Sequence, residues 1–144
     1  MRDAMVASLT FDIFHKYTDR LKMATIAQIA NVLQAMVLTK GKSMILTPTY
    51  YVFKMYRVHQ DATFLPLDLT CDSIKADNYT IPLVSATASK DSKGVIHISL
   101  SNIDLKNTKE VIINLSGIPT KRISGEILPS KYNSDHNTFQ HPQT

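Results

Sequence analysis

The chain has 144 residues, of which 44% are hydrophobic and 19% are charged, and its formal net charge is +4. These values are ordinary for a soluble globular protein, and the length suits one domain or two small pieces. The lysines are scattered and form no dense basic block, which argues against nucleic-acid binding. Gln28, Asn31, Gln34 and Lys40 interrupt the longest apolar run, so no membrane span is expected. Cys71 is the only cysteine, which excludes an intrachain disulfide bond.

Two helices are expected in the first 60 residues, which are rich in methionine, alanine, leucine and aromatic side chains. Asp3 can cap a helix that runs to about Tyr17. One face of this helix carries apolar side chains near helical spacing: Met5, Val6, Leu9, Ile13 and Phe14. Thr47 and Pro48 are typical of a second helix start, with threonine as the N-cap and proline in the first turn. This second helix would run to His59.

The segment from Leu21 to Ile29, between these helices, is apolar at nearly every second or third position. Its periodicity fits a buried strand or a buried helix, and a fully buried parallel strand has this composition. With a strand here and a loop at residues 40–43, the order of elements is that of an α/β unit. Two amides, Gln28 and Asn31, lie inside the apolar run. Because burying an amide without a partner costs about 1–3 kcal/mol, both are expected to have something to bond.

The character of the chain changes near residues 60–63, after which isoleucine, valine, threonine and serine dominate and turn residues are frequent. Short alternating segments then predict strands: Phe64 to Thr70, Ile81 to Thr87, Val95 to Ser101, Val111 to Leu115 and Ile123 to Leu128. The turn-rich stretch from Ser89 to Gly94 predicts a hairpin between the second and third of them. Strands at this spacing indicate a β-sandwich, and the tail from Ser130 onward is polar.

No motif for catalysis, metal binding or cofactor binding is recognised in the sequence. There is no phosphate-binding loop, dinucleotide-binding fingerprint or HExxH motif. The histidines match no metal-binding spacing: His15, His59, His97, His136 and His141. The only glutamates are Glu110 and Glu126, both in the second half, and the aspartates lie mostly in turns. No pair of facing carboxyl groups on stiff elements emerges, and neither a metal nor a cofactor is expected.

The run HKYTDRLKMATIAQIANVLQAM from His15 to Met36, followed by MILTPTYYVF from Met44, resembles glycoside hydrolase family 51. The members of this family are α-L-arabinofuranosidases. The resemblance is specific over residues 15–60 and extends in layout to the family's C-terminal β-domain. It implies an α/β plus all-β architecture. Residues 1–60 would be the last α-β-α segment of a (β/α)8 barrel, with Leu21 to Ile29 as the eighth strand. Residues 61–144 would be a partial jelly-roll β-sandwich.

The resemblance also implies a role for Gln28. In a (β/α)8 enzyme the active site lies at the C-terminal ends of the strands. A glutamine of the family at this place hydrogen-bonds the arabinofuranose, and the resemblance implies that substrate-binding role for Gln28. For Asn31 we expect a bond that braces the loop, with a second contact to the sugar as the less favoured role. Family members use one glutamate as acid/base and another as nucleophile, both on earlier strands. No segment of this chain matches either motif, so no catalytic residue is expected here.

The function implied is that of the C-terminal portion of a retaining enzyme of hemicellulose degradation. It would remove terminal α-L-arabinofuranosyl residues from arabinan, arabinoxylan or arabino-oligosaccharides, and this chain alone would be inactive. Nothing in the chain resembles a signal peptide, and a cytoplasmic, periplasmic or secreted parent stays open.

Two alternatives remain. One is a non-catalytic β-sandwich module for polysaccharide or protein binding, against which the absence of tryptophan argues. The other is a structural subdomain for homo-oligomer contacts, because an uncovered apolar run at residues 21–37 would promote association.

Overall fold

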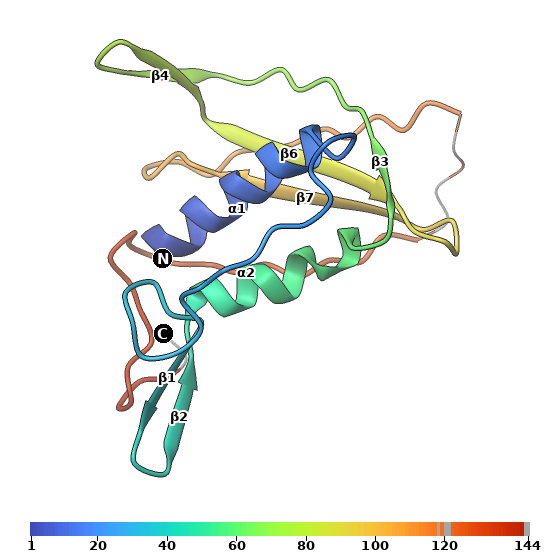
Figure 1. Cartoon of the computed structure of the whole chain (residues 1–144). Coiled ribbons are helices and arrows are strands. Elements are labelled where there is room, and N and C mark those ends of the chain that lie inside the picture. The colour runs from blue at the N-terminus through green and yellow to red at the C-terminus, as the bar shows by residue number, and fades with distance from the viewer. Residues whose placement is uncertain (118, 120–121, 143–144) are drawn as a thin grey trace.

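The computed structural model describes residues 1–117, 119 and 122–142. Within these residues, two helices pack beside each other against a three-stranded antiparallel sheet, and two hairpins stand apart from it (Figure 1). The elements in chain order are α1 (Arg2–Lys16), β1 (Val37–Lys40), β2 (Ser43–Leu46), α2 (Pro48–Tyr56), the 3-10 helix η1 (Arg57–His59), β3 (Thr63–Leu65), β4 (Ser73–Ala76), β5 (Tyr79–Pro82), β6 (Val84–Lys90) and β7 (Ile96–Asn102). Neither described helix combines the length and the apolar character needed to cross a membrane.

The predicted first helix is confirmed, but different side chains face the interior. Met1 is the N-cap of α1 and makes no side-chain cap, so Asp3 lies in the first turn instead of at the cap. A carboxylate is favourable there because of the helix dipole. Val6 and Ile13, expected on the apolar face, are 52% and 54% exposed. The buried residues of α1 are small or polar: Ala4, Ser8 and Asp12. This inner face allows the helix to approach the sheet closely and to bond to it.

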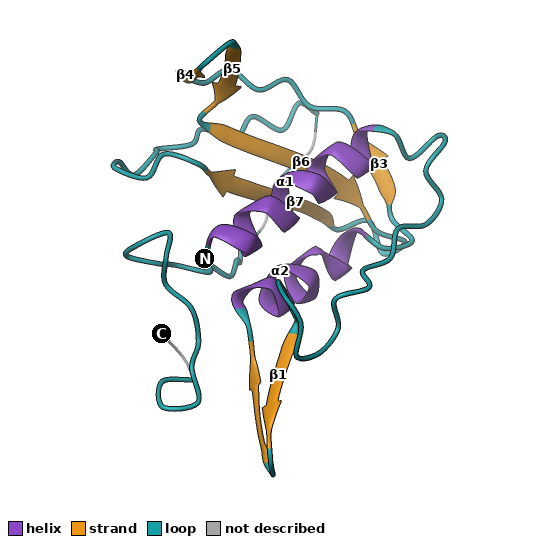
Figure 2. Ribbon diagram, turned by 60° about the vertical axis from the view of Figure 1, so that its left-hand side comes forward, coloured by secondary structure: helices purple, strands orange, loops and turns teal. Residues whose placement is uncertain are grey.

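The predicted second helix begins where the sequence indicates. Thr47 is the N-cap of α2, its side-chain oxygen accepts from the Tyr50 amide at 3.5 Å, and Pro48 lies in the first turn. The helix lies beside α1 (Figure 2), and Phe11 of α1 stacks on Tyr56 with ring centroids 5.1 Å apart. The buried apolar cluster between the two helices consists of Ala4, Val52 and Tyr56. This small cluster holds the helix pair together.

The prediction of a strand at residues 21–29 is wrong for this structure. The segment has no regular secondary structure and is almost entirely exposed, with Met23 at 79%. A parallel strand needs a neighbour to take its backbone hydrogen bonds. Among the described residues no strand lies beside it, and the nearest pairing is a single parallel bridge between Ala30 and Val37. The described residues accordingly form no closed barrel.

The loop expected at residues 40–43 is the tip of an antiparallel hairpin. Strands β1 and β2 pair from Val37 opposite Leu46 to Lys40 opposite Ser43. Gly41 at the tip has a φ of 59°, a left-handed conformation that glycine adopts without steric cost. The hairpin projects from the end of the molecule opposite β4 (Figure 1).

The hairpin predicted in the second half is confirmed. Strand β6 pairs with β7 from Val84 opposite Asn102 to Lys90 opposite Ile96, and β3 pairs with the other edge of β6. Between β6 and β7, Asp91 accepts from the backbone amides of Lys93 and Val95 at 2.9 Å each. The carboxylate therefore fixes the turn that the sequence indicated.

The other strands expected in this half are shortened or absent. The strand expected at residues 64–70 is reduced to β3, and residues 111–115 and 123–128 form no strand. Ile112 is 81% exposed and Ile127 is 87% exposed, although Leu128 packs against the cluster of Ala4, Val52 and Tyr56. A hairpin of β4 and β5, which the sequence did not indicate, forms a separate small sheet. The described residues thus form three small antiparallel sheets and no complete sandwich.

Candidate functional site

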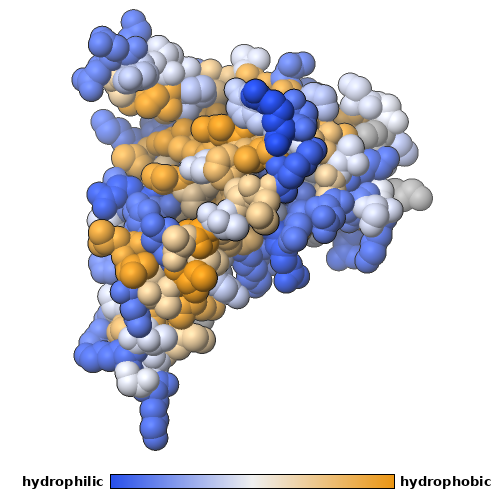
Figure 3. Space-filling model, viewed as in Figure 1, coloured by the Kyte–Doolittle hydropathy of each residue, from blue (hydrophilic) through white to orange (hydrophobic). Residues whose placement is uncertain are grey.

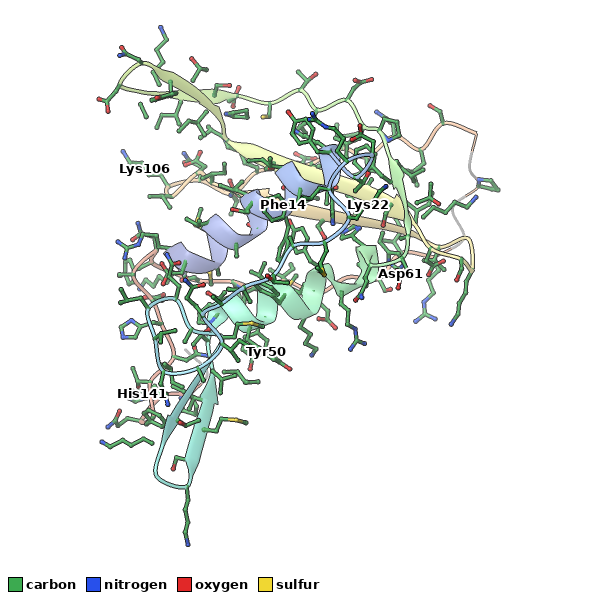
Figure 4. All side chains as sticks on the ribbon, in the orientation of Figure 1. Phe14, Lys22, Tyr50, Asp61, Lys106 and His141 are labelled. Atoms are coloured by element: carbon green, nitrogen blue, oxygen red, sulfur yellow. The ribbon has the colours of Figure 1, made fainter. Side chains whose placement is uncertain are left out.

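Gln28 lies at one end of residues 28–37, here called the Gln28 loop, which leads from the irregular segment after α1 into β1. That segment, with Lys22 near its start (Figure 4), runs past α2 toward the β1–β2 hairpin (Figure 1). Backbone hydrogen bonds join the two ends of the loop. Met36 N donates to the Gln28 carbonyl at 3.3 Å and Val37 N to the Ile29 carbonyl at 3.0 Å. Gln28 is exposed, so its backbone is held while its side chain is accessible.

Asn31 braces this loop against β1. Its side-chain Nδ2 donates to Thr39 Oγ1 at 2.8 Å, and its Oδ1 accepts from the Thr39 backbone amide, also at 2.8 Å. Both ends of the amide are therefore used by one residue of the neighbouring strand. Asn31 has a φ of 55°, a left-handed conformation in which asparagine is enriched.

Thr47 connects the Gln28 loop to α2. The hydroxyl of Thr47 donates to the Ala35 carbonyl at 2.7 Å, and its backbone amide donates to the Met36 carbonyl at 3.0 Å. The same hydroxyl accepts from Tyr50 N as the helix cap. The orientation of the loop is therefore coupled to the start of the second helix.

Around these braces the segment exposes large apolar side chains. The most exposed are Met23, Ile29, Val32 and Leu33, at 79%, 61%, 52% and 88%. On the face seen in Figure 3, hydrophobic residues gather over the middle of the molecule, between the β4 end and the β1–β2 end. Apolar side chains concentrated at one place are typical of a surface that contacts another polypeptide.

No metal-binding cluster occurs among the described residues, and both glutamates lie far along the chain from Gln28. Glu110 and Glu126 are both exposed and lie in the segments after β7. No group of three or more histidine, cysteine, aspartate or glutamate side chains that could hold a metal ion occurs among the described residues. The exposed amide of Gln28 can donate and accept hydrogen bonds but does not titrate.

The described residues do contain a buried polar network, which joins α1 and α2 to the sheet. Asp12 is 1% exposed and accepts hydrogen bonds from the Tyr56 hydroxyl at 2.8 Å and the Ser85 hydroxyl at 2.5 Å. Burial raises the pKa of Asp12, against the opposing effect of these two bonds. Burial next to the carboxylate likewise raises the pKa of Tyr56. One carboxylate therefore binds hydroxyls from α2 and β6 together.

His59 extends this network along the sheet. The side chain of His59 is 7% exposed, with Nδ1 2.7 Å from Ser89 Oγ and Nε2 2.8 Å from Ser99 Oγ. Burial, together with the nearby His15 and His97, lowers the pKa of His59 to about 4. At neutral pH the ring is thus neutral, with a hydroxyl partner at each nitrogen. Burial also lowers the pKa of His15, whose Nδ1 lies 3.1 Å from Thr87 Oγ1.

Sequence reasoning missed this network. It identified the histidines only by their lack of metal-binding spacing, whereas His97 Nε2 lies 3.1 Å from Asp91 Oδ2. The available signal was the alternation of serine and threonine in β6 and β7, which placed hydroxyls on the inner face opposite the polar stripe of α1. The network has every buried side-chain polar atom paired within the described residues, which is typical of a structural role.

Exposed aromatic side chains do not form a row on the described surface. Tyr17 is 49% exposed directly after α1, and Tyr79 is 73% exposed on β5. Tyr132 is 57% exposed in the tail beside the N-terminus, where Arg2 N donates to the Asn133 carbonyl. The β4–β5 hairpin and this tail lie at separate ends in both views (Figures 1 and 2). Stacking platforms for sugars need several aromatic faces together, so this arrangement does not favour the binding-module alternative.

Comparisons with known proteins identify the family of this chain. The profile described as "Alpha-L-arabinofuranosidase C-terminal domain" matches residues 1–144. An intracellular exo-α-L-arabinofuranosidase of Bacteroides ovatus is 63% identical over 143 residues, which are 99% of this chain and 28% of that protein. The chain therefore belongs to the C-terminal domain family of the α-L-arabinofuranosidases of glycoside hydrolase family 51, as the sequence resemblance indicated.

Solved structures agree with this assignment. The crystal structure of the family 51 arabinofuranosidase from Xanthomonas axonopodis pv. citri matches with a TM-score of 0.91 and 42% identity over 96% of this chain and 28% of that chain. A family 51 α-L-arabinofuranosidase from Bifidobacterium longum shares the fold with a TM-score of 0.86, at 21% identity, over 99% of this chain and 28% of that chain. The chain thus spans about 28% of the length of the relatives it matches.

Proposed function

We propose that this chain acts as the C-terminal part of a retaining α-L-arabinofuranosidase that removes terminal arabinofuranosyl residues from arabinan, arabinoxylan or arabino-oligosaccharides. The observation that carries the proposal is the 63% identity over nearly the whole chain to an enzyme named for exo-α-L-arabinofuranosidase activity. The reaction class requires two carboxyl groups about 5–5.5 Å apart, one as nucleophile and one as acid/base. The two glutamates of this chain lie in the segments after β7, outside the barrel segment, so in this proposal both groups come from the rest of the enzyme.

In this proposal, residues 1–60 complete one end of the catalytic (β/α)8 barrel and residues 61–144 contribute to a jelly-roll sandwich. The exposed apolar side chains of residues 21–33 support this arrangement, because the remainder of a barrel would cover them. The buried network at Asp12 and His59 would keep the two parts in a fixed orientation, since α1, α2 and the sheet share it.

Gln28 would orient the arabinofuranosyl unit in the glycone subsite. An uncharged amide suits this task because it both donates to and accepts from sugar hydroxyls. The exposed side chain of Gln28 and the hydrogen-bonded ends of its loop support the assignment. Both ends of the Asn31 amide are bonded to Thr39, so its main role is to hold the loop, and a contact with the sugar is secondary.

The test is a chimera in which residues 1–144 replace the matching 28% of the Bacteroides ovatus enzyme. The chimera should hydrolyse an aryl α-L-arabinofuranoside with a rate close to that of the unaltered enzyme. Gln28→Ala in the chimera should lower kcat/KM by about tenfold or more, the equivalent of one lost hydrogen bond in the transition state. Gln60→Ala, which removes an exposed glutamine outside the loop, serves as the control.

Two results would refute these proposals separately. A chimera that folds with a normal thermal transition but has no activity would contradict the proposed function. An active chimera in which Gln28→Ala has the rate of the control would remove Gln28 from the subsite and leave the family function standing.

A further inference from the structure

We propose that Asn31 and Thr39 form a positioning clamp that fixes the Gln28 loop and thereby directs the Gln28 side chain toward its ligand. This inference rests on the proposed function, because it concerns the same subsite. The role of the clamp requires no contact of either residue with the sugar. They act through Gln28, and are therefore positioning residues.

The geometry of the clamp is that of a two-point contact. Asn31 uses its donor and its acceptor on one partner, at 2.8 Å for both bonds, and one of the two bonds goes to the backbone of β1. A single bond would leave the loop free to rotate about it, whereas two bonds between the same pair fix both distance and orientation. β1 is itself held in register with β2 by backbone pairing, so the clamp attaches the loop to a strand whose position is fixed.

The conformation of Asn31 shows why an asparagine serves here. Its φ of 55° reverses the chain between Ala30 and β1, and most side chains are strained in that region. Glycine would accept the conformation but would supply neither bond. Asparagine does both, because its short amide tolerates the left-handed region and reaches Thr39 from there.

The clamp has a second connection to the rest of the fold. Asn31 N donates to the Val37 carbonyl at 3.1 Å, and Met36 N donates to the Gln28 carbonyl at 3.3 Å. Thr47, the cap of α2, bonds to Ala35 and Met36 on the opposite side of the loop. Gln28 is thus three residues from Asn31, and its carbonyl is bonded to Met36, the residue directly before β1. A movement at Asn31 is therefore transmitted to Gln28.

The test uses the active chimera and a set of matched variants. Asn31→Gly keeps the left-handed backbone and removes both clamp bonds. It therefore separates the effect of losing these bonds from the effect of changing the backbone conformation. Thr39→Val removes the hydroxyl at nearly constant volume, whereas Thr39→Ser keeps it. Lys42→Ala at the exposed hairpin tip is the control for substitutions in this region. Steady-state kinetics on an aryl α-L-arabinofuranoside and thermal unfolding are measured for each.

The expected result is that Asn31→Gly lowers kcat/KM by about tenfold while the thermal midpoint stays that of the control. Thr39→Val should lower kcat/KM by a smaller factor, and Thr39→Ser should retain the original value. The decisive variant is the double substitution with Gln28→Ala. If the clamp acts through Gln28, Asn31→Gly causes no further loss once Gln28 is absent.

Two outcomes would overturn the clamp. One is wild-type kinetics in Asn31→Gly alongside a strong effect of Gln28→Ala, which would leave the proposed subsite standing and remove only the clamp. The other is full additivity of Asn31→Gly and Gln28→Ala, which would mean that Asn31 acts independently of Gln28. Failure of the proposed subsite differs from both, because Gln28→Ala itself would then have no effect.

Discussion

The chain contains two polar arrangements of similar size with opposite surroundings. The network of Asp12, Tyr56 and His59 lies where two helices meet a sheet, and its side-chain bonds close within the described residues. The Gln28 loop lies on the surface, among apolar side chains that are largely exposed. The buried polar atoms of the first arrangement are all paired within the described residues, whereas the second leaves Gln28 and several large apolar side chains exposed. Burial therefore separates the residues that stabilise this domain from those that, in the proposed function, would face the rest of the enzyme.

The largest effect is expected at the buried carboxylate. Asp12→Ala removes the acceptor of two buried hydroxyls, and each unsatisfied hydroxyl costs about 1–3 kcal/mol. We expect a loss of about 3–4 kcal/mol in the free energy of unfolding, measured by urea denaturation of the chain. Asp12→Asn should lose less, since it retains one acceptor and removes a charge whose ionisation burial opposes.

Asp19→Ala is the control for that substitution, because Asp19 is exposed just after α1. It should change the free energy of unfolding by less than about 0.5 kcal/mol. A similarly small effect of Asp12→Ala would mean that the network does not stabilise the packing of the helices on the sheet.

The second effect is a pH dependence that originates at His59. The folded pKa of about 4 lies below the ordinary value of 6.5, so the folded state disfavours the charged ring. The resulting stability is present above pH 6.5 and is lost as the pH falls toward 4. We expect a loss of about 2 kcal/mol over this interval, measured as the urea midpoint at each pH.

His59→Gln can bond the same hydroxyls without titrating, so its unfolding should depend less steeply on pH in this interval. The difference between the two slopes isolates His59 from the carboxylates, which titrate at the acid end of the same range. Parallel slopes in both proteins would show that His59 does not carry the acid sensitivity.

The smallest effect is expected in the exposed segment, and it depends on what surrounds the chain. Leu33 is 88% exposed, so Leu33→Ser in the chain alone should change the free energy of unfolding by less than about 0.5 kcal/mol. In the chimera, where the rest of the enzyme would cover this side chain, the same substitution should cost about 1–2 kcal/mol. Equal effects in the chain alone and in the chimera would contradict the proposal that the rest of the enzyme covers residues 21–33.

Local signals predicted part of this fold and long-range contacts decided the rest. Thr47 and Pro48 mark the start of α2 through capping chemistry, which operates within one turn and is visible in the sequence. The turn at Asp91 is specified in the same local way. Residues 21–29 and 111–115 also have strand composition, but strands form only beside partners, and no described strand lies next to either.

The candidate site shows the same division. Gln28 and Asn31 stand out because both are amides inside an apolar run, but only the resemblance to a family suggested a sugar-binding role for Gln28. The partner of Asn31, Thr39, could not be inferred, since the left-handed turn that brings them together depends on the paired hairpin. The buried network was missed because helical periodicity assigned the apolar face of α1 to the interior, whereas Ser8 and Asp12 occupy it.

The most direct test of the central claim is the hydrolysis of an aryl α-L-arabinofuranoside by the chain alone and by the chimera. The account predicts no release of arabinose by residues 1–144, and activity in the chimera that falls on Gln28→Ala. Release of arabinose by the isolated chain, abolished by Glu110→Gln or Glu126→Gln, would show that the chain carries its own catalytic carboxylate and would contradict the account.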